Sequence, residues 1–207
     1  MITPEQAATF ERCMTVGGVA IFGADTVYGL ACKPDDRGAV ERLYAIKGRR
    51  PDKPAAVMFF SRDLALAALP ELGPRTTAAA ESLMPGPVTI LLPNPGHRFP
   101  LACGPDLETL GLRVPALGPP TAALAAVSWP VLQSSANPSG GAEARRLSDI
   151  PQRIRDAVDL VLDAGELDGT ASTVIDLRRF EEEGIWRIVR EGALPEGAVA
   201  SALAPLT

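Results

Sequence analysis

The stretch Thr173–Val189 reads TVIDLRRFEEEGIWRIV and decides the fold class. Its two apolar runs, 173–177 and 185–189, are rich in β-branched residues and predict two strands close together in the chain. Elsewhere the pattern alternates short apolar strands with helical segments, which is typical of α/β proteins. Because the close pair breaks this alternation, the sequence predicts a three-layer α/β fold with a mixed sheet.

The remaining elements follow outward from this pair. The apolar runs predict further strands at 19–22, 55–60, 88–92, 109–114, 131–133 and 160–162. Helical periodicity and capping residues predict helices at 3–16, 38–47, 61–68, 74–83, 119–127, 148–156 and 195–203. No linker, internal repeat or low-complexity tract divides the chain, so we expect one domain over residues 1–207.

Composition excludes several classes of function. The chain has 207 residues, of which 46% are apolar and 22% are charged, as in an ordinary soluble globular protein. Its only histidine, His97, excludes a multi-histidine metal site, and its three cysteines form no CxxC pair. A net charge of -5 argues against a protein that coats nucleic acid, although it leaves room for a local basic patch. Without a signal peptide or an apolar membrane span, we expect a cytoplasmic protein with no membrane partner.

A basic loop follows the predicted helix 38–47. Four cations lie close together there: Lys47, Arg49, Arg50 and Lys53. Two prolines and a glycine restrain this loop and prevent it from continuing as a helix. A restrained cationic loop suits a polyphosphate, and a solvated surface loop is the alternative interpretation.

Three more polar segments follow or lie within predicted strands, where open α/β sheets bind ligands. Asp25 and Thr26 offer a carboxylate and a hydroxyl after strand 19–22, or they simply cap a turn. Arg113 lies in an apolar strand, where it can hold a ligand carboxylate or form a buried ion pair. Segment 133–141, QSSANPSGG, presents several small hydrogen-bonding groups. Walker, GxGxxG and GxSxG motifs are all absent from the chain.

Taken together and in order, seven motifs over about residues 15–193 resemble the YrdC-like family of threonylcarbamoyl-adenylate synthases. They are DTVYGL at 25–30, KxR at 47–49, PGPxT at 85–89, RxP at 113–115, SANxSG at 135–140, STV at 172–174 and RxG at 190–192. Each motif is weak alone, and their order makes the resemblance specific. The chain looks like the short, stand-alone form of the family.

The resemblance implies a twisted mixed sheet flanked by helices, with one large concave cavity. It also implies a nucleotidyltransferase reaction in which L-threonine, bicarbonate and ATP give threonylcarbamoyl-AMP and pyrophosphate for tRNA modification. Mg²⁺ is expected on the ATP phosphates and not on protein side chains. Other proteins of tRNA threonylcarbamoyl transfer, and weak tRNA contact, are the implied partners.

By the same resemblance, specific side chains acquire roles. Lys47 and Arg49 would stabilise charge on the departing pyrophosphate as the catalytic pair. The implied ATP contacts are Lys47, Arg49, Lys53, Thr109, Ser135, Asn137, Arg145 and Arg190. The implied threonine contacts are Thr26, Arg113, Ser135 and Ser172, with Arg113 taking the carboxylate.

Two departures from the family pattern concern the threonine side. Gly23-Ala24 stands where the family usually has proline and then threonine or serine, and Met58 stands where many members have histidine. Two other functions therefore remain open. One is a related carbamoyl-adenylate chemistry, as in the YrdC-like module of hydrogenase-maturation carbamoyltransferases, and the other is an RNA- or nucleotide-binding module without catalysis.

Overall fold

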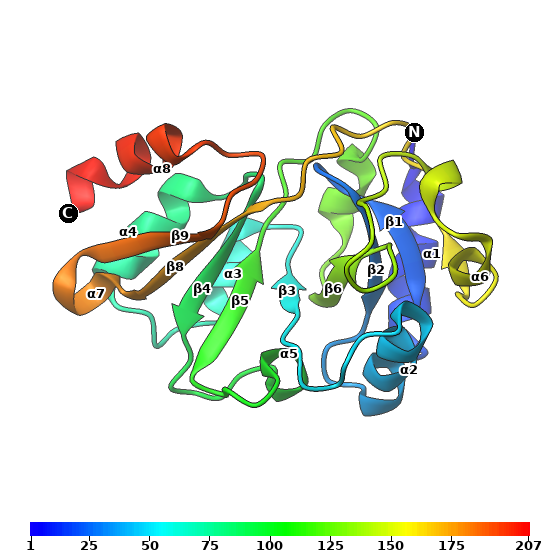
Figure 1. Ribbon diagram of the computed structural model, residues 1–207, viewed down its shortest axis with the longest axis horizontal. Coiled ribbons are helices and arrows are strands. Elements are labelled where there is room, and N and C mark those ends of the chain that lie inside the picture. The colour runs from blue at the N-terminus through cyan, green and yellow to red at the C-terminus, as the bar shows by residue number, and fades with distance from the viewer.

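A computed structural model describes all residues, 1–207. Nine strands form one sheet in the order β7-β1-β2-β6-β3-β5-β4-β8-β9 (Figure 1). In chain order the strands are β1 Ala20–Gly23, β2 Tyr28–Cys32, β3 Ala56–Met58, β4 Val88–Pro93, β5 Thr109–Arg113, β6 Val131–Ser135, β7 Leu160–Val161, β8 Thr173–Arg179 and β9 Ile185–Arg190.

The pairing of the strands confirms the mixed sheet. β1 with β7, β3 with β5 and β4 with β8 run parallel, whereas the other neighbours run antiparallel. The pair β8–β9, which the sequence placed close together, is antiparallel and lies at one edge of the sheet. Only the four-residue helix α7, Phe180–Glu183, separates these two strands.

Helices begin and end largely where the capping residues predict. The α-helices are α1 Pro4–Thr15, α2 Arg37–Lys47, α3 Arg62–Ala67, α4 Pro74–Leu83, α5 Pro100–Cys103, α6 Gln152–Arg155, α7 Phe180–Glu183 and α8 Glu196–Leu203. The 3-10 helices are η1 Ala122–Ala126, η2 Leu147–Asp149 and η3 Ala204–Leu206. Thr3 forms a capping box at the start of α1. Gly48 ends α2 in the left-handed conformation, φ 64°, which turns the chain into the basic loop.

The short helices α5, α7 and η3 were not predicted, and the structure differs from the sequence expectation in three further elements. β2 had no predicted counterpart, because its first three residues were assigned to the DTVYGL motif, yet all five residues are buried. The helix expected at 119–127 is only the 3-10 turn η1. The helix expected at 148–156 is divided into η2 and α6, because Pro151 lies between them and lacks the N–H that a continuous helix needs.

The core is one cluster of 51 buried residues. It includes Phe10 of α1, Phe22 of β1 and Phe60, whose ring centroids lie 5.2 to 6.1 Å apart. In Figure 1 helices α4 and α8 lie beside the β8–β9 end of the sheet, whereas α1, α2 and α6 lie beside the β1–β2 end. No helix has both the length and the apolar character that crossing a bilayer requires.

Candidate functional site

A cavity of about 180 Å³ lies where strands β3, β4, β5, β6, β8 and β9 meet the basic loop. It is lined by Val27, Arg49, Pro54, Ala55, Ala56, Thr89, Arg113, Gln133, Ser134, Ser135, Glu143, Ala171, Ser172, Val174 and Arg190. Five of these residues were predicted site residues: Arg49, Arg113, Ser135, Ser172 and Arg190. The lining contains three arginines and one carboxylate, so it is predominantly cationic. This is the kind of local basic patch that the net charge of the chain left room for.

Arg113 ends β5 and is almost fully buried, with 4% of its surface exposed. Its Nη2 donates to Asp25 Oδ1 at 2.5 Å and to Thr26 Oγ1 at 2.6 Å. The other Asp25 oxygen, Oδ2, accepts from the Ala116 N–H. A buried guanidinium needs such a partner to offset its lost hydration, so Asp25 neutralises Arg113 and fixes its orientation. Its Nε remains without any partner.

Lys47, the last residue of α2, forms hydrogen bonds with the end of β6 and the loop that follows it. Its Nζ donates to the Asn137 carbonyl and side-chain oxygen at 2.9 and 2.8 Å, and also to the Ser135 carbonyl oxygen. Ser135 Oγ in turn donates to Asn137 Oδ1 at 2.7 Å. Burial, followed by the neighbouring Arg49 charge, lowers the pKa of Lys47 to about 8. Lys47 therefore stands behind the cavity wall and orders Ser135 and Asn137.

The opposite wall comes from β4, β8 and β9. Thr89 and Ser172 share a hydrogen bond of 2.8 Å between their hydroxyl oxygens. Arg190 Nη2 donates to the Ser172 carbonyl oxygen at 2.6 Å and lies 3.4 Å from Ser172 Oγ. These contacts hold one hydroxyl pair and one guanidinium at the cavity surface.

Besides Lys47 and Asn137, which lie behind the wall, three more predicted ATP residues lie outside this cavity. Lys53 is exposed in the basic loop. Arg145 pairs with Glu166 at 2.9 Å on the surface. Thr109 stands at the start of β5, where its hydroxyl donates to Asp106 and accepts from Arg178. The structure therefore groups the predicted threonine contacts more tightly than the predicted ATP contacts.

Sequence reasoning missed two acidic residues of the site. The sequence offered the carboxylate of Asp25 on a turn, yet Asp25 was not among the predicted site residues. The signal that could have found it is Arg113, because an arginine in an apolar strand needs an acidic partner. Glu143 lines the cavity on the loop after β6. Nothing in the sequence singles it out, because its closeness to Lys47 arises only from the fold.

The two departures from the family pattern have different surroundings. A Cβ added to Gly23 would lie 2.7 Å from the Ala164 Cβ, so this packing has no room for a side chain. Met58 is fully buried in β3, where its backbone pairs with Arg113. The backbone of Met58 thus lies next to the site. The absence of a side chain at Gly23 is explained by its close packing against Ala164.

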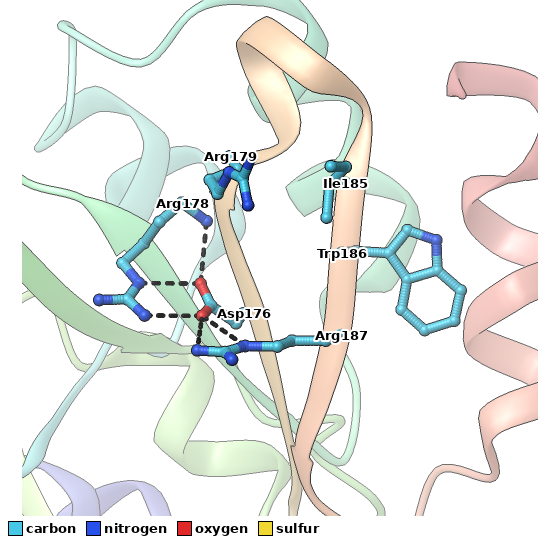
Figure 2. A pocket seen from close by; sticks show the side chains of 6 residues that line it. All are labelled: Asp176, Arg178, Arg179, Ile185, Trp186 and Arg187. Carbon is cyan, nitrogen blue, oxygen red and sulfur yellow. Dashed lines mark hydrogen bonds and ion pairs between the residues drawn. The ribbon is translucent and has the colours of Figure 1, made fainter.

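A larger hollow, about 390 Å³, lies along β8 and β9 beside Asp176 (Figure 2). Asp176 accepts two hydrogen bonds from Arg178, at 2.9 and 2.7 Å, and a further one from Arg187 at 3.1 Å. Arg179 is paired with Glu183. Since these guanidiniums already have carboxylate partners, the hollow offers fewer free donors than the cavity beside Arg113. The chain holds no grouping of three or more His, Cys, Asp or Glu side chains that could hold a metal ion.

Comparison with known proteins agrees with this arrangement. Residues 12–192 match the Sua5/YciO/YrdC family profile, which is described as "Telomere recombination". The chain is 33% identical over 181 residues to a threonylcarbamoyl-AMP synthase of Chromohalobacter salexigens, covering 86% of this chain and 96% of that protein. It is 28% identical to the Pyrococcus abyssi protein of the same name over 86% of this chain, and spans about half of that relative's length, 52%.

A solved structure shows the same fold. The P. abyssi Sua5 protein complexed with L-threonine superposes with a TM-score of 0.84 at 26% identity, covering 98% of this chain and 58% of that one. The predicted mixed α/β fold of the YrdC-like type is thereby confirmed. The chain belongs to the Sua5/YciO/YrdC family.

Proposed function

We propose that this protein is an L-threonylcarbamoyladenylate synthase, a nucleotidyltransferase that converts L-threonine, bicarbonate and ATP into threonylcarbamoyl-AMP and pyrophosphate. The observation that carries the proposal is the cationic cavity with the oriented, buried Arg113 at its wall. Its relatives named threonylcarbamoyl-AMP synthase support the same activity.

The amino acid would occupy the cavity itself. A cavity volume of about 180 Å³ has room for one small amino acid. The free Nε of Arg113 would donate to the substrate carboxylate, while Thr26 keeps that guanidinium in place. Ser172 and Ser135 line the same cavity, and their side chains would hydrogen-bond to the amino acid.

The nucleotide would extend from the cavity along β5, over one face of the sheet. Arg49 and Arg190 line the cavity and would meet the phosphates there. Thr109 lies four residues before Arg113 on the same strand, about 13 Å away at 3.3 Å per residue, and on the same face of the sheet. That separation suits a nucleoside joined to a triphosphate, so Thr109 would contact its far end.

The protein then acts mainly by positioning and by charge. The α-ammonium group of threonine first loses a proton to solvent, and the neutral amine then attacks the carbon of bicarbonate, which forms a carbamate and releases water. A carbamate oxygen attacks the α-phosphorus of ATP, and the bond to the β-phosphate oxygen breaks to release pyrophosphate. Holding the two reactants together can supply on the order of 7–11 kcal/mol of the barrier. Arg49 would stabilise charge on the leaving pyrophosphate.

Mg²⁺ would be carried by the nucleotide. The chain has no grouping of three acidic, histidine or cysteine ligands, whereas phosphate oxygens are ligands that Mg²⁺ prefers. When bound, the ion supplies charge neutralisation on the phosphates. Lys47 would contribute from behind the wall, by ordering Ser135 and Asn137.

Pyrophosphate release tests the proposal. The purified protein is incubated with ATP and Mg²⁺, with L-threonine and bicarbonate added singly and together. We expect release only when both are present, and threonylcarbamoyl-AMP as the product. ATP bound without threonine-dependent release would instead favour a nucleotide-binding module.

A further inference from the structure

Three buried side-chain atoms without hydrogen-bond partners belong to residues that line one cavity. They are Arg49 Nε, Arg113 Nε and Glu143 Oε2, half of the six such atoms in the chain. A buried polar atom without a partner costs about 1–3 kcal/mol, so three of them in residues around one cavity call for a physical explanation. The set consists of two donors and one acceptor.

The acceptor is unusual for this cavity. Glu143 contributes the only carboxylate of the lining, which otherwise carries three arginines. A ligand with only negative charge would be attracted by the arginines and repelled by Glu143. A ligand with one carboxylate and one ammonium group pairs the carboxylate with Arg113 and the ammonium with Glu143, and it leaves Arg49 for the phosphates.

We propose that Glu143 accepts a hydrogen bond from the α-ammonium group of the amino-acid substrate, while Arg113 binds the carboxylate of the same molecule. This inference rests on the proposed function and adds to it the residue that recognises the amino group. Glu143 thereby selects amino acids over the corresponding hydroxy acids, and it orients the nitrogen that is carbamoylated.

The dimensions of the cavity allow this double contact. Arg113 on β5 and Glu143 on the loop after β6 line the same cavity of about 180 Å³, so one bound amino acid is offered both side chains. A metal ion is a poorer occupant beside Glu143, because no second or third carboxylate, histidine or cysteine accompanies it.

The main test compares wild type with Glu143→Gln, which keeps the shape of the side chain and removes its charge. We expect the KM for L-threonine to rise about 10- to 100-fold, the range for a lost charge-assisted hydrogen bond. The KM for ATP should stay within about twofold. Glu182→Gln, at an exposed glutamate of α7, is the matched control and should change neither value.

A second arm uses the hydroxy acid in which a hydroxyl replaces the α-amino group of threonine. Isothermal titration calorimetry measures binding of threonine and of this analogue to both proteins. Wild type should prefer threonine, and Glu143→Gln should lose most of that preference. An unchanged preference overturns the proposal, and so does a variant whose defect lies in the KM for ATP or in the Mg²⁺ requirement.

Binding and turnover separate the two proposals. If wild type binds threonine through Glu143 yet releases no pyrophosphate, the inference stands and the proposed synthase activity is wrong. If wild type is an active synthase and Glu143→Gln matches it in every measurement, the inference alone is wrong. A wild-type protein that binds no amino acid overturns the inference.

Discussion

Replacing Asp25 by asparagine tests how the fold prepares Arg113 for a ligand. Asp25 and Arg113 form an ion pair with side chains that are each only 5% exposed. Asparagine keeps the size and one acceptor oxygen but removes the charge that balances the guanidinium. The variant therefore leaves a buried positive charge without its partner.

The expected cost follows from this burial. Removing one member of a buried pair destabilises a protein by about 3–5 kcal/mol. For a chain of this size, 1 kcal/mol shifts the melting temperature by roughly 2–4 °C, so Tm should fall by about 6–20 °C. Asp52→Asn is the matched control, because the Arg50–Asp52 pair has side chains that are 74% and 50% exposed. Its loss should cost less than about 1 kcal/mol.

Urea unfolding gives the stability change, and threonine saturation curves give the functional one. We expect Asp25→Asn to raise the KM for threonine, because the guanidinium is no longer held, while Asp52→Asn leaves that KM unchanged. If Asp25→Asn loses no more stability than Asp52→Asn and binds threonine normally, Asp25 does not hold Arg113 and this account of the site is wrong.

Three further predictions concern other parts of the molecule. Lys47→Ala should reduce turnover and also destabilise the fold by about 2–4 kcal/mol, since the oxygens that its ammonium satisfies are left buried; equal stability in urea would refute this. Gly23→Ser should cost about 1–3 kcal/mol because its Cβ would meet Ala164, whereas Gly197→Ala, with open space, should not destabilise; similar melting temperatures for both would contradict the packing argument. Hydrogen bonds from Arg178 lower the pKa of Asp176 from 3.8 to about 2, so about 2 kcal/mol of stability, present above pH 4, should disappear as the pH falls towards 2. Asp176→Asn should abolish that part of the acid dependence in unfolding experiments at a series of pH values.

Much of the sheet follows from local pattern. Apolar runs are correct guides for β4 and β5, and the close pair in 173–189 correctly indicates a mixed sheet. β2 escapes prediction because it lies between β1 and β6 in the sheet. β6 is distant in sequence, and the turn that joins β1 to β2 is ambiguous in the sequence. Local composition cannot reveal a strand whose apolar environment is supplied entirely by tertiary contacts.

The site divides in the same way. Motif order places Arg113 and Ser172 at one cavity, although 59 positions of chain separate them. Motif order does not reveal that Lys47 donates a hydrogen bond to Asn137 behind the cavity wall. This contact depends on where α2 ends relative to β6. Glu143 is invisible for a similar reason: a single glutamate in a loop becomes notable only when the fold leaves its oxygen without a partner.

A crystal structure with L-threonine and a non-hydrolysable ATP analogue tests the central claim most directly. We predict the threonine carboxylate on Arg113, its amino group on Glu143, and the phosphates beside Arg49 and Arg190. Threonine bound elsewhere, or a nucleotide phosphate in contact with Arg113, would contradict the assignment of this cavity to the amino acid.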